Sequence, residues 1–362
     1  MQPPSTILFV LVGWYHSVSS QISLPFKDSI ATGLSFDGQP LKMMLDTSLS
    51  GTYVVYKEWY EKTFGKGACK RSQGGCYSCP GECNPYSRER NVLTFLDGGS
   101  ITSVIHEGMV KIGKYKLKMK FRLIIGYSAG AELPHWKPPN YLGLGFADSS
   151  NLETLPRSLY DKGIIKRYTI SICSPSDPVF FQGTVILGEW KGLCRIKSDV
   201  TTIPMAQSHD LGHILSDLSS YGLVSSTGKT YTQHRVGAAE YDTGTVFLCL
   251  PRVIFEDFCN KIVSFAGPDV FLKTDDEGFW YITAKRRKNF PTLTFSVGDP
   301  RHPVIIRIPP ERYAIRCNSK WCRLALLFWD GSQVILGRPF FTSYFSSYDL
   351  KSRTISIAEY HG

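Results

Sequence analysis

Apolar residues along this chain fall mostly into short continuous or alternating runs separated by turn residues, which is the pattern of β-strands. Because successive side chains of a strand point to opposite faces, such runs suit sheets with one buried face. The clearest predicted strands are Ser103–Val110, Tyr168–Cys173, Thr184–Gly188 and Leu293–Val297. The chain is therefore expected to be mainly β.

Helical periodicity is rarer than strand periodicity. Pro251–Phe265 has proline at its start and apolar side chains at helical spacing, which predicts an amphipathic helix. Leu155–Lys166 is a second predicted helix, with Gly163 near its end. We expect a few short helices beside many strands.

An internal repeat relates the two halves of the chain. An apolar run leads into Asp46 within Asp-Thr-Ser, and a similar segment leads into Asp242 within Asp-Thr-Gly-Thr. Two apolar residues and a glycine follow each time: Gly143 lies 97 positions after Asp46, and Gly337 lies 95 positions after Asp242. Two Asp-Thr turns that only cap local structure would not explain this nearly equal spacing.

Composition agrees with a folded chain that has many turns. Hydrophobic residues make up 43% and charged residues 20%, with 32 glycines and 21 prolines. The formal net charge of +10 raises the question of nucleic-acid binding. Basic residues are scattered, however, apart from Lys285–Lys288, and no binding module is recognisable. We expect no nucleic-acid partner and interpret the cluster as a solvated loop.

The first residues predict an export signal. Ile7–Val12 is a short apolar run, and Ser17–Ser20 supplies small residues suited to cleavage. Residues 1–20 are therefore interpreted as a signal peptide, the alternative being a hydrophobic strand or a short anchor. No later segment is long enough to cross a bilayer. We expect a soluble mature chain, secreted or in the lumen of an acidic compartment of the secretory pathway.

Ten cysteines fit an exported chain, because disulfides persist in oxidising compartments. Two predicted pairs are Cys317 with Cys322 and Cys173 with Cys194, and Cys249 and Cys259 are left unassigned. The other four lie close together: Cys69, Cys76, Cys79 and Cys83. Such a cluster can hold a metal ion. Two surface disulfides are favoured in an exported chain, and no metal site is expected.

The paired motifs resemble those of the pepsin-like aspartic proteases. That family has an apolar strand, an Asp-Thr-Gly-Ser or Asp-Thr-Gly-Thr loop, a flap hairpin, and an apolar-apolar-Gly strand behind each aspartate loop. Residues 242–245 match without change, and residues 334–349 resemble the closing motif. The resemblance implies a mainly β, bilobal fold with an N-terminal lobe over 21–200 and a C-terminal lobe over 201–362. The cysteine-rich insert of the first lobe resembles that of nepenthesin-like plant enzymes.

The resemblance also implies an activity, aspartic endopeptidase. Asp46 and Asp242 would form the catalytic pair, since two close carboxylates share one proton and can activate a water molecule. Peptide or protein substrates, acidic working pH, no cofactor, no metal and a monomeric chain are expected.

Further site residues follow from the same resemblance. Thr47 and Thr243 would brace the two loops against each other, and the loop support includes Ser48, Gly244 and Thr245, of which Thr245 would orient Asp242. The segment 94–100 resembles the flap hairpin, which gives Phe95, Asp97 and Gly98 as flap residues in contact with substrate.

The first half departs from the family pattern at three places. Ser48 replaces the usual glycine, Leu49 stands where a hydroxyl residue normally supports the first aspartate, and Phe95 replaces the flap tyrosine. Lost support around a catalytic group can cost orders of magnitude in rate. A catalytically inactive relative that binds peptides or a protein partner in its cleft is therefore the alternative. A disulfide-rich extracellular interaction module would explain the cysteines but not the paired aspartates.

Overall fold

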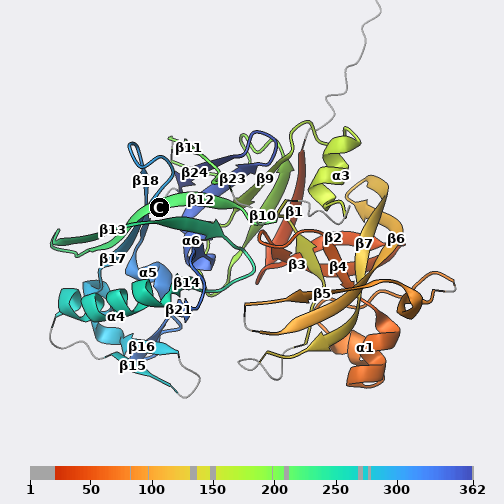
Figure 1. Cartoon of the computed structure of the whole chain (residues 1–362), viewed down its shortest axis with the longest axis horizontal. Helices are drawn as coiled ribbons and strands as arrows, with labels where there is room; N and C mark the ends of the chain where they lie inside the picture. Colours follow the sequence, from red (N-terminus) through yellow and green to blue (C-terminus); the bar gives the residue numbers. More distant parts are fainter. Residues whose placement is uncertain are drawn as a thin grey trace, which may run out of the picture.

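A computed structural model describes the following residues of the chain: 21–81, 83–96, 98–130, 137–146, 152–197, 199–207, 212–267, 272–275 and 279–360. The predicted signal peptide lies outside these residues. Figure 1 shows two lobes side by side, one coloured red to yellow and the other green to blue. Strands predominate and most helices are short. The predicted mainly β, bilobal fold is confirmed.

A sheet of 13 strands forms the first lobe and continues between the lobes (Figure 1). Its strands, in sheet order, are β11 (Thr201–Pro204), β24 (Thr354–Glu359), β23 (Tyr344–Asp349), β9 (Thr169–Cys173), β10 (Gln182–Gly188), β1 (Gln21–Lys27), β2 (Ile30–Phe36), β3 (Gln39–Asp46), β8 (Tyr141–Gly143), β4 (Thr52–Val55), β7 (Tyr115–Ser128), β6 (Ser100–Ile112) and β5 (Arg90–Thr94). The last strands of the chain thus pair with strands of its first half. The lobe boundary near residue 200 stays a prediction.

Two smaller sheets form the second lobe. The seven-stranded sheet contains, in order, β18 (Val304–Ile308), β17 (Thr292–Val297), β12 (Leu215–Val224), β13 (Thr230–Tyr241), β22 (Val334–Leu336), β14 (Leu248–Pro251) and β21 (Leu326–Trp329). The four-stranded sheet contains β15 (Leu272–Thr274), β16 (Trp280–Thr283), β20 (Trp321–Leu324) and β19 (Ala314–Ile315). The strands predicted from apolar runs all occur, with ends that differ by a few residues.

The helices are α1 (Lys57–Phe64), α2 (Ala68–Arg71), α3 (Leu155–Asp161), α4 (Arg252–Ala266), α5 (Pro310–Tyr313) and α6 (Arg338–Phe341), with 3₁₀ turns η1 (Pro85–Ser87) and η2 (Ala284–Asn289). The predicted amphipathic helix is confirmed as α4. It follows Pro251 directly and buries Ile254, Phe258 and Ile262, which lie on one face at helical spacing. Within the described residues, no helix is both long and apolar enough to span a membrane.

The other predicted helix, Leu155–Lys166, is too long, because α3 ends at Asp161. Gly163 has a φ of 67°, in the left-handed region that glycine adopts readily. Its amide donates to the Tyr160 carbonyl at 2.9 Å, and the next amide donates back to Leu159 at 2.9 Å. These bonds close the last helical turn before Lys166 is reached.

Strand pairing shows the internal repeat. In the first lobe β3 runs parallel to β8, and β8 runs antiparallel to β4. In the second lobe β13 runs parallel to β22, and β22 runs antiparallel to β14. In each lobe, the strand before the aspartate is therefore paired with the strand of the apolar-apolar-Gly segment of the same half. The equal spacing in the sequence reflects two copies of one arrangement.

Four disulfides confirm the prediction made from the even cysteine count. They join Cys69 to Cys76, Cys79 to Cys83, Cys173 to Cys194 and Cys317 to Cys322. Cys249 and Cys259 are buried thiols. The cysteine-rich insert between α1 and β5 therefore carries two disulfides, each closing a short loop.

Candidate active site

The two predicted aspartates lie at equivalent strand ends. Asp46 is the last residue of β3, and Asp242 directly follows β13. The Asp46 carbonyl accepts a hydrogen bond from the Leu144 amide at 2.7 Å, and the Asp242 amide donates to the Leu336 carbonyl at 3.1 Å. Each aspartate is thus fixed to the apolar strand behind it, β8 in one lobe and β22 in the other.

The carboxyl groups face each other beside Gly244. A Cβ atom built on Gly244 would lie 2.9 Å from Asp46 Oδ2 and 3.0 Å from Asp242 Oδ1, so both carboxyls approach one point. The Ser48 amide donates to Asp46 Oδ1 at 2.9 Å, and the Gly244 amide donates to Asp242 Oδ1 at 2.7 Å. Each loop therefore orients its own aspartate with a backbone N–H group two residues on.

Two threonines 196 positions apart join the loops. The Thr47 amide donates to Thr243 Oγ1 at 3.2 Å, and the Thr243 amide donates to Thr47 Oγ1 at 3.0 Å. The Thr47 hydroxyl in turn donates to the Tyr241 carbonyl at 2.6 Å. Both threonines are fully buried, so these reciprocal bonds are shielded from water. They fix the distance between the two aspartate loops.

Burial is the main influence on both carboxyls. It raises the pKa of Asp46 to about 6, and, together with the neighbouring charge of Asp46, it raises the pKa of Asp242 well above its ordinary value. The backbone amides of Ser48 and Gly244 lower the pKa of the aspartates they contact. Two close carboxylates do not both ionise cheaply, so we expect the pair to share one proton and to titrate as a unit.

We expect the contribution of the aspartate pair to the free energy of unfolding to decrease as pH rises through the acidic range. The folded-state pKa values of Asp46 and Asp242 lie above the ordinary value of 3.8, so over that interval these two carboxyls bind more protons in the folded chain than in the unfolded chain. The resulting stabilisation is complete below the unfolded-state pKa and is lost as pH rises through the folded-state values. Urea unfolding of the wild type and of Asp46→Asn at a series of pH values measures this contribution. The free energy of unfolding of the variant should increase relative to that of the wild type as pH rises, and a difference that is constant with pH would contradict the expectation.

Comparison with known proteins identifies the family. The family pattern described as eukaryotic aspartyl protease matches residues 32–360. The chain belongs to the eukaryotic aspartyl protease family. The pepsin-like resemblance is thereby confirmed, while the nepenthesin-like branch stays a prediction.

Individual relatives of the chain are distant. It is 22% identical over 346 residues to the probable aspartic-type endopeptidase opsB of Aspergillus fumigatus, a match that covers 90% of this chain and 67% of that protein. It is 21% identical over 344 residues to the probable vacuolar protease A of Trichophyton verrucosum, covering 89% and 75%. Gastricsin of Macaca fuscata fuscata is 28% identical over 123 residues, which are 32% of this chain and 29% of gastricsin.

The predicted flap of the chain is the turn between β5 and β6. The Phe95 amide donates to the Gly99 carbonyl at 2.7 Å, and the Gly98 amide donates back to Phe95 at 3.0 Å. The Phe95 ring packs against Tyr141, with 5.5 Å between ring centroids. Tyr141 lies in β8, directly behind the Asp46 strand. Phe95 is thus held on the Asp46 side of the pair, and Asp97 lies outside the described residues.

The structure resolves the effect of the sequence departures on the loops. Ser48 keeps the backbone contact to Asp46 that Gly244 makes to Asp242. Leu49 is buried, at 7% exposure, and supplies no hydroxyl.

Thr245 differs from its predicted role. Its hydroxyl accepts from the Phe247 amide at 3.4 Å and lies 3.7 Å from the Cys249 sulfur. Among the hydrogen bonds of the described residues it makes none to Asp242, because the loop turns its side chain back toward β14. The Gly244 amide, rather than the Thr245 hydroxyl, orients Asp242.

Three polar residues beside the pair were missed from the sequence. Glu240, at 2% exposure, lies two residues before Asp242 and contacts His213 and Gln333. One signal was available: the corresponding position before Asp46 is the apolar Met44, whereas the second half carries a glutamate. Its partners could not be read from the pattern, because they come from other strands.

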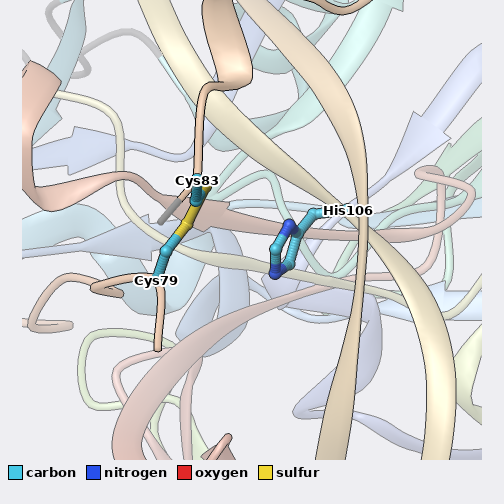
Figure 2. A group of neighbouring side chains, drawn as sticks. All are labelled: Cys79, Cys83 and His106. Carbon is cyan, nitrogen blue, oxygen red and sulfur yellow. A yellow bond between two sulfur atoms is a disulfide. The ribbon is translucent and has the colours of Figure 1, made fainter. Parts of the chain in front are cut away.

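The cysteine-rich insert contacts β6 around the side chain of His106, which Figure 2 shows. The Cys79–Cys83 disulfide lies beside the His106 ring, with one potential ligand atom of each residue within 4.8 Å of the others. A disulfide sulfur is not a thiolate ligand. The ring nitrogens of His106 contact the Tyr77 hydroxyl at 2.9 Å and Arg88 Nη1 at 3.2 Å. The arrangement therefore fits an anchor of the insert on the sheet.

Proposed function

We propose that this chain is an aspartic endopeptidase that hydrolyses internal peptide bonds, with Asp46 and Asp242 as its catalytic pair. The observation that carries the proposal is the approach of both carboxyls to one point beside Gly244, with each oriented by a backbone amide. Family membership supports the reaction class. The reciprocal threonine bonds supply the rigidity that such a pair requires.

The raised pKa values of the pair suit general acid–base chemistry. With one proton shared, the charged member takes a proton from a water molecule as that water attacks the scissile carbonyl carbon. The protonated member donates its proton to the carbonyl oxygen, which gives a tetrahedral diol. As the diol collapses, one of its hydroxyls gives a proton to the now charged member, the other member gives its proton to the amide nitrogen, and the C–N bond breaks. An amine and a carboxylic acid leave, and the pair again holds one proton. The chain's own carboxyls supply each proton transfer, so the cycle closes without a covalent intermediate.

Other elements give this proposal its context. Phe95 would cover the substrate from the flap, with its ring supported by Tyr141. Four disulfides within the described residues suit an oxidising environment, which agrees with a secreted or lumenal location. We further propose that the chain works on peptides or proteins as a monomer.

The proposal is tested with the full chain produced in a secretory host. A mixed peptide library is incubated across acidic to neutral pH, with and without pepstatin, and the cleaved products are identified by mass spectrometry. We expect cleavage at internal bonds, inhibition by pepstatin, and a bell-shaped pH profile on the acidic side of neutrality, because the pair must hold one proton. Activity that continued to rise above neutral pH would contradict the assignment.

The second candidate function is peptide binding without cleavage, which the buried apolar Leu49 favours because it removes a hydroxyl from the surroundings of Asp46. A folded chain that binds members of the library but cleaves none would support this candidate over the endopeptidase.

A further inference from the structure

Glu240 lies near the end of β13, two residues before the candidate catalytic Asp242, which directly follows this strand. Side chains alternate along a strand, so residues two apart point the same way and are separated by about 7 Å along the chain. Glu240 stands in this relation to Asp242. It is 2% exposed, which is unusual for a glutamate. A third carboxyl therefore lies beneath the surface next to the pair.

Two strand ends provide the polar partners of Glu240. His213, just before β12, places Nδ1 2.5 Å from Glu240 Oε1. Gln333, just before β22, donates from Nε2 to Glu240 Oε2 at 3.1 Å. Both neighbours follow from the sheet, since β12 and β22 flank β13 on its two sides. Each carboxyl oxygen thus has its own partner.

Hydrogen bonding and charge keep Glu240 ionised despite its burial. Burial alone would raise its pKa, but the contacts with His213 and Gln333 lower the pKa below its ordinary value. A buried carboxylate with two fixed partners holds its negative charge in one place. The His213 side chain is 38% exposed, so its outer edge reaches the solvent.

The charge of Glu240 acts on both aspartates. It raises the pKa of Asp46 and of Asp242, whereas His213 lowers the pKa of Asp46. Among the described residues, the titratable groups that interact with Glu240 are Asp242 directly after its own strand, Asp46 at the end of β3, and His213 before β12.

We propose that Glu240, held by His213 and Gln333, is a positioning residue that acts through the aspartate pair, so that its negative charge keeps the shared proton on the pair to higher pH. The proposal rests on the proposed endopeptidase function. The role of Glu240 differs from that of a general acid or base, because Glu240 does not touch the reacting atoms. His213 has the opposite effect on the pKa of Asp46 and so limits the effect of Glu240.

The test compares the pH dependence of kcat/KM in the full chain and two variants. Glu240→Gln keeps the size of the side chain and removes the charge, so both limbs of the profile should move to lower pH by about one unit. His213→Gln removes the opposing positive charge and keeps a donor for Glu240, so the alkaline limb should move to higher pH. Asp299→Asn, an exposed carboxyl next to β17 that pairs with Arg301, is the matched control and should leave the profile in place.

A purely structural role would produce a different result. In that case the Glu240→Gln variant would have a lower kcat or a lower denaturation midpoint, while both limbs of its pH profile stayed in place. That outcome overturns the proposal. If Glu240→Gln does not fold, the His213→Gln variant decides, because its residue is partly exposed. An alkaline limb that stays in place or moves to lower pH in His213→Gln overturns the proposal as well.

A titration that needs no activity separates this inference from the proposed function. Carbon-13 NMR of the aspartate carboxyls, assigned with Asp46→Asn and Asp242→Asn, follows the protonation of the pair in the full chain and in Glu240→Gln. We expect the apparent pKa values of the pair to fall by about one unit in Glu240→Gln. An inactive wild-type chain with this shift would refute the endopeptidase and support the coupling. An active chain without the shift would refute the coupling alone.

Discussion

Replacing Asp46 or Asp242 by asparagine should lower kcat/KM for peptide cleavage by about 10⁴-fold, because the members of a catalytic unit fail together. Asparagine keeps the size of the side chain and can accept the backbone N–H bond of Ser48 or Gly244. It cannot take a proton from water or donate one to a carbonyl oxygen. Progress curves on a peptide identified from the library measure the loss.

The fold should survive either change. Burial already favours the uncharged form of both side chains, as their raised pKa values show. The neutral asparagine should therefore leave the denaturation midpoint near neutral pH unchanged or higher. Asp217→Asn, an exposed carboxyl on β12 of the second lobe, serves as control for activity. Cleavage that persisted within tenfold of wild type in either active-site variant would show that the pair is not catalytic.

Replacing Gly143 by alanine should destabilise the chain by about 3 kcal/mol or more, the range in which steric overlap in a packed core is severe. A Cβ atom there would lie 2.2 Å from the Gly51 carbonyl oxygen and 2.4 Å from the Leu49 carbonyl oxygen. Both contacts are with main-chain atoms of the loop that follows Asp46, which cannot move aside without shifting that aspartate. Urea unfolding followed by tryptophan fluorescence measures the effect.

Gly237→Ala provides the matched control for this prediction. Gly237 lies in β13, and a Cβ atom built on it has no heavy atom within 4 Å. Its replacement should change the free energy of unfolding by less than about 1 kcal/mol. If Gly143→Ala were as stable as Gly237→Ala, the close approach of Gly143 in β8 to the loop after Asp46 would be wrong.

The second half repeats the requirement seen at Gly143. A Cβ atom on Gly337 would lie 2.1 Å from the Phe247 carbonyl oxygen, in the loop after Asp242. The glycine that ends each apolar-apolar-Gly segment is thus explained by one contact made twice. The sequence repeat could be found by spacing alone, but the reason for its glycines is a distance between backbones.

Local patterns determined much of the fold. Apolar alternation gave the strands, and helical spacing after Pro251 gave α4, because these periods arise from the geometry of the backbone itself. The repeated Asp-Thr segments predicted the two candidate aspartates, since a duplicated lobe carries its aspartate loop twice. The predicted helix Leu155–Lys166 was too long because apolar residues continue past Gly163. The helix itself ends at Asp161, and the left-handed backbone of Gly163 closes the turn that follows.

Tertiary structure decided which groups meet. Thr47 bonds Thr243 across 196 positions, and His213 reaches Glu240 from a neighbouring strand. Thr245 turns toward Phe247 rather than Asp242. These contacts depend on strand register and on the path of each loop, which are set by packing of the whole sheet rather than by any local period. The sequence by itself therefore determined the two aspartates and the duplicated strands around them, while only the tertiary structure placed the third carboxylate beside the pair.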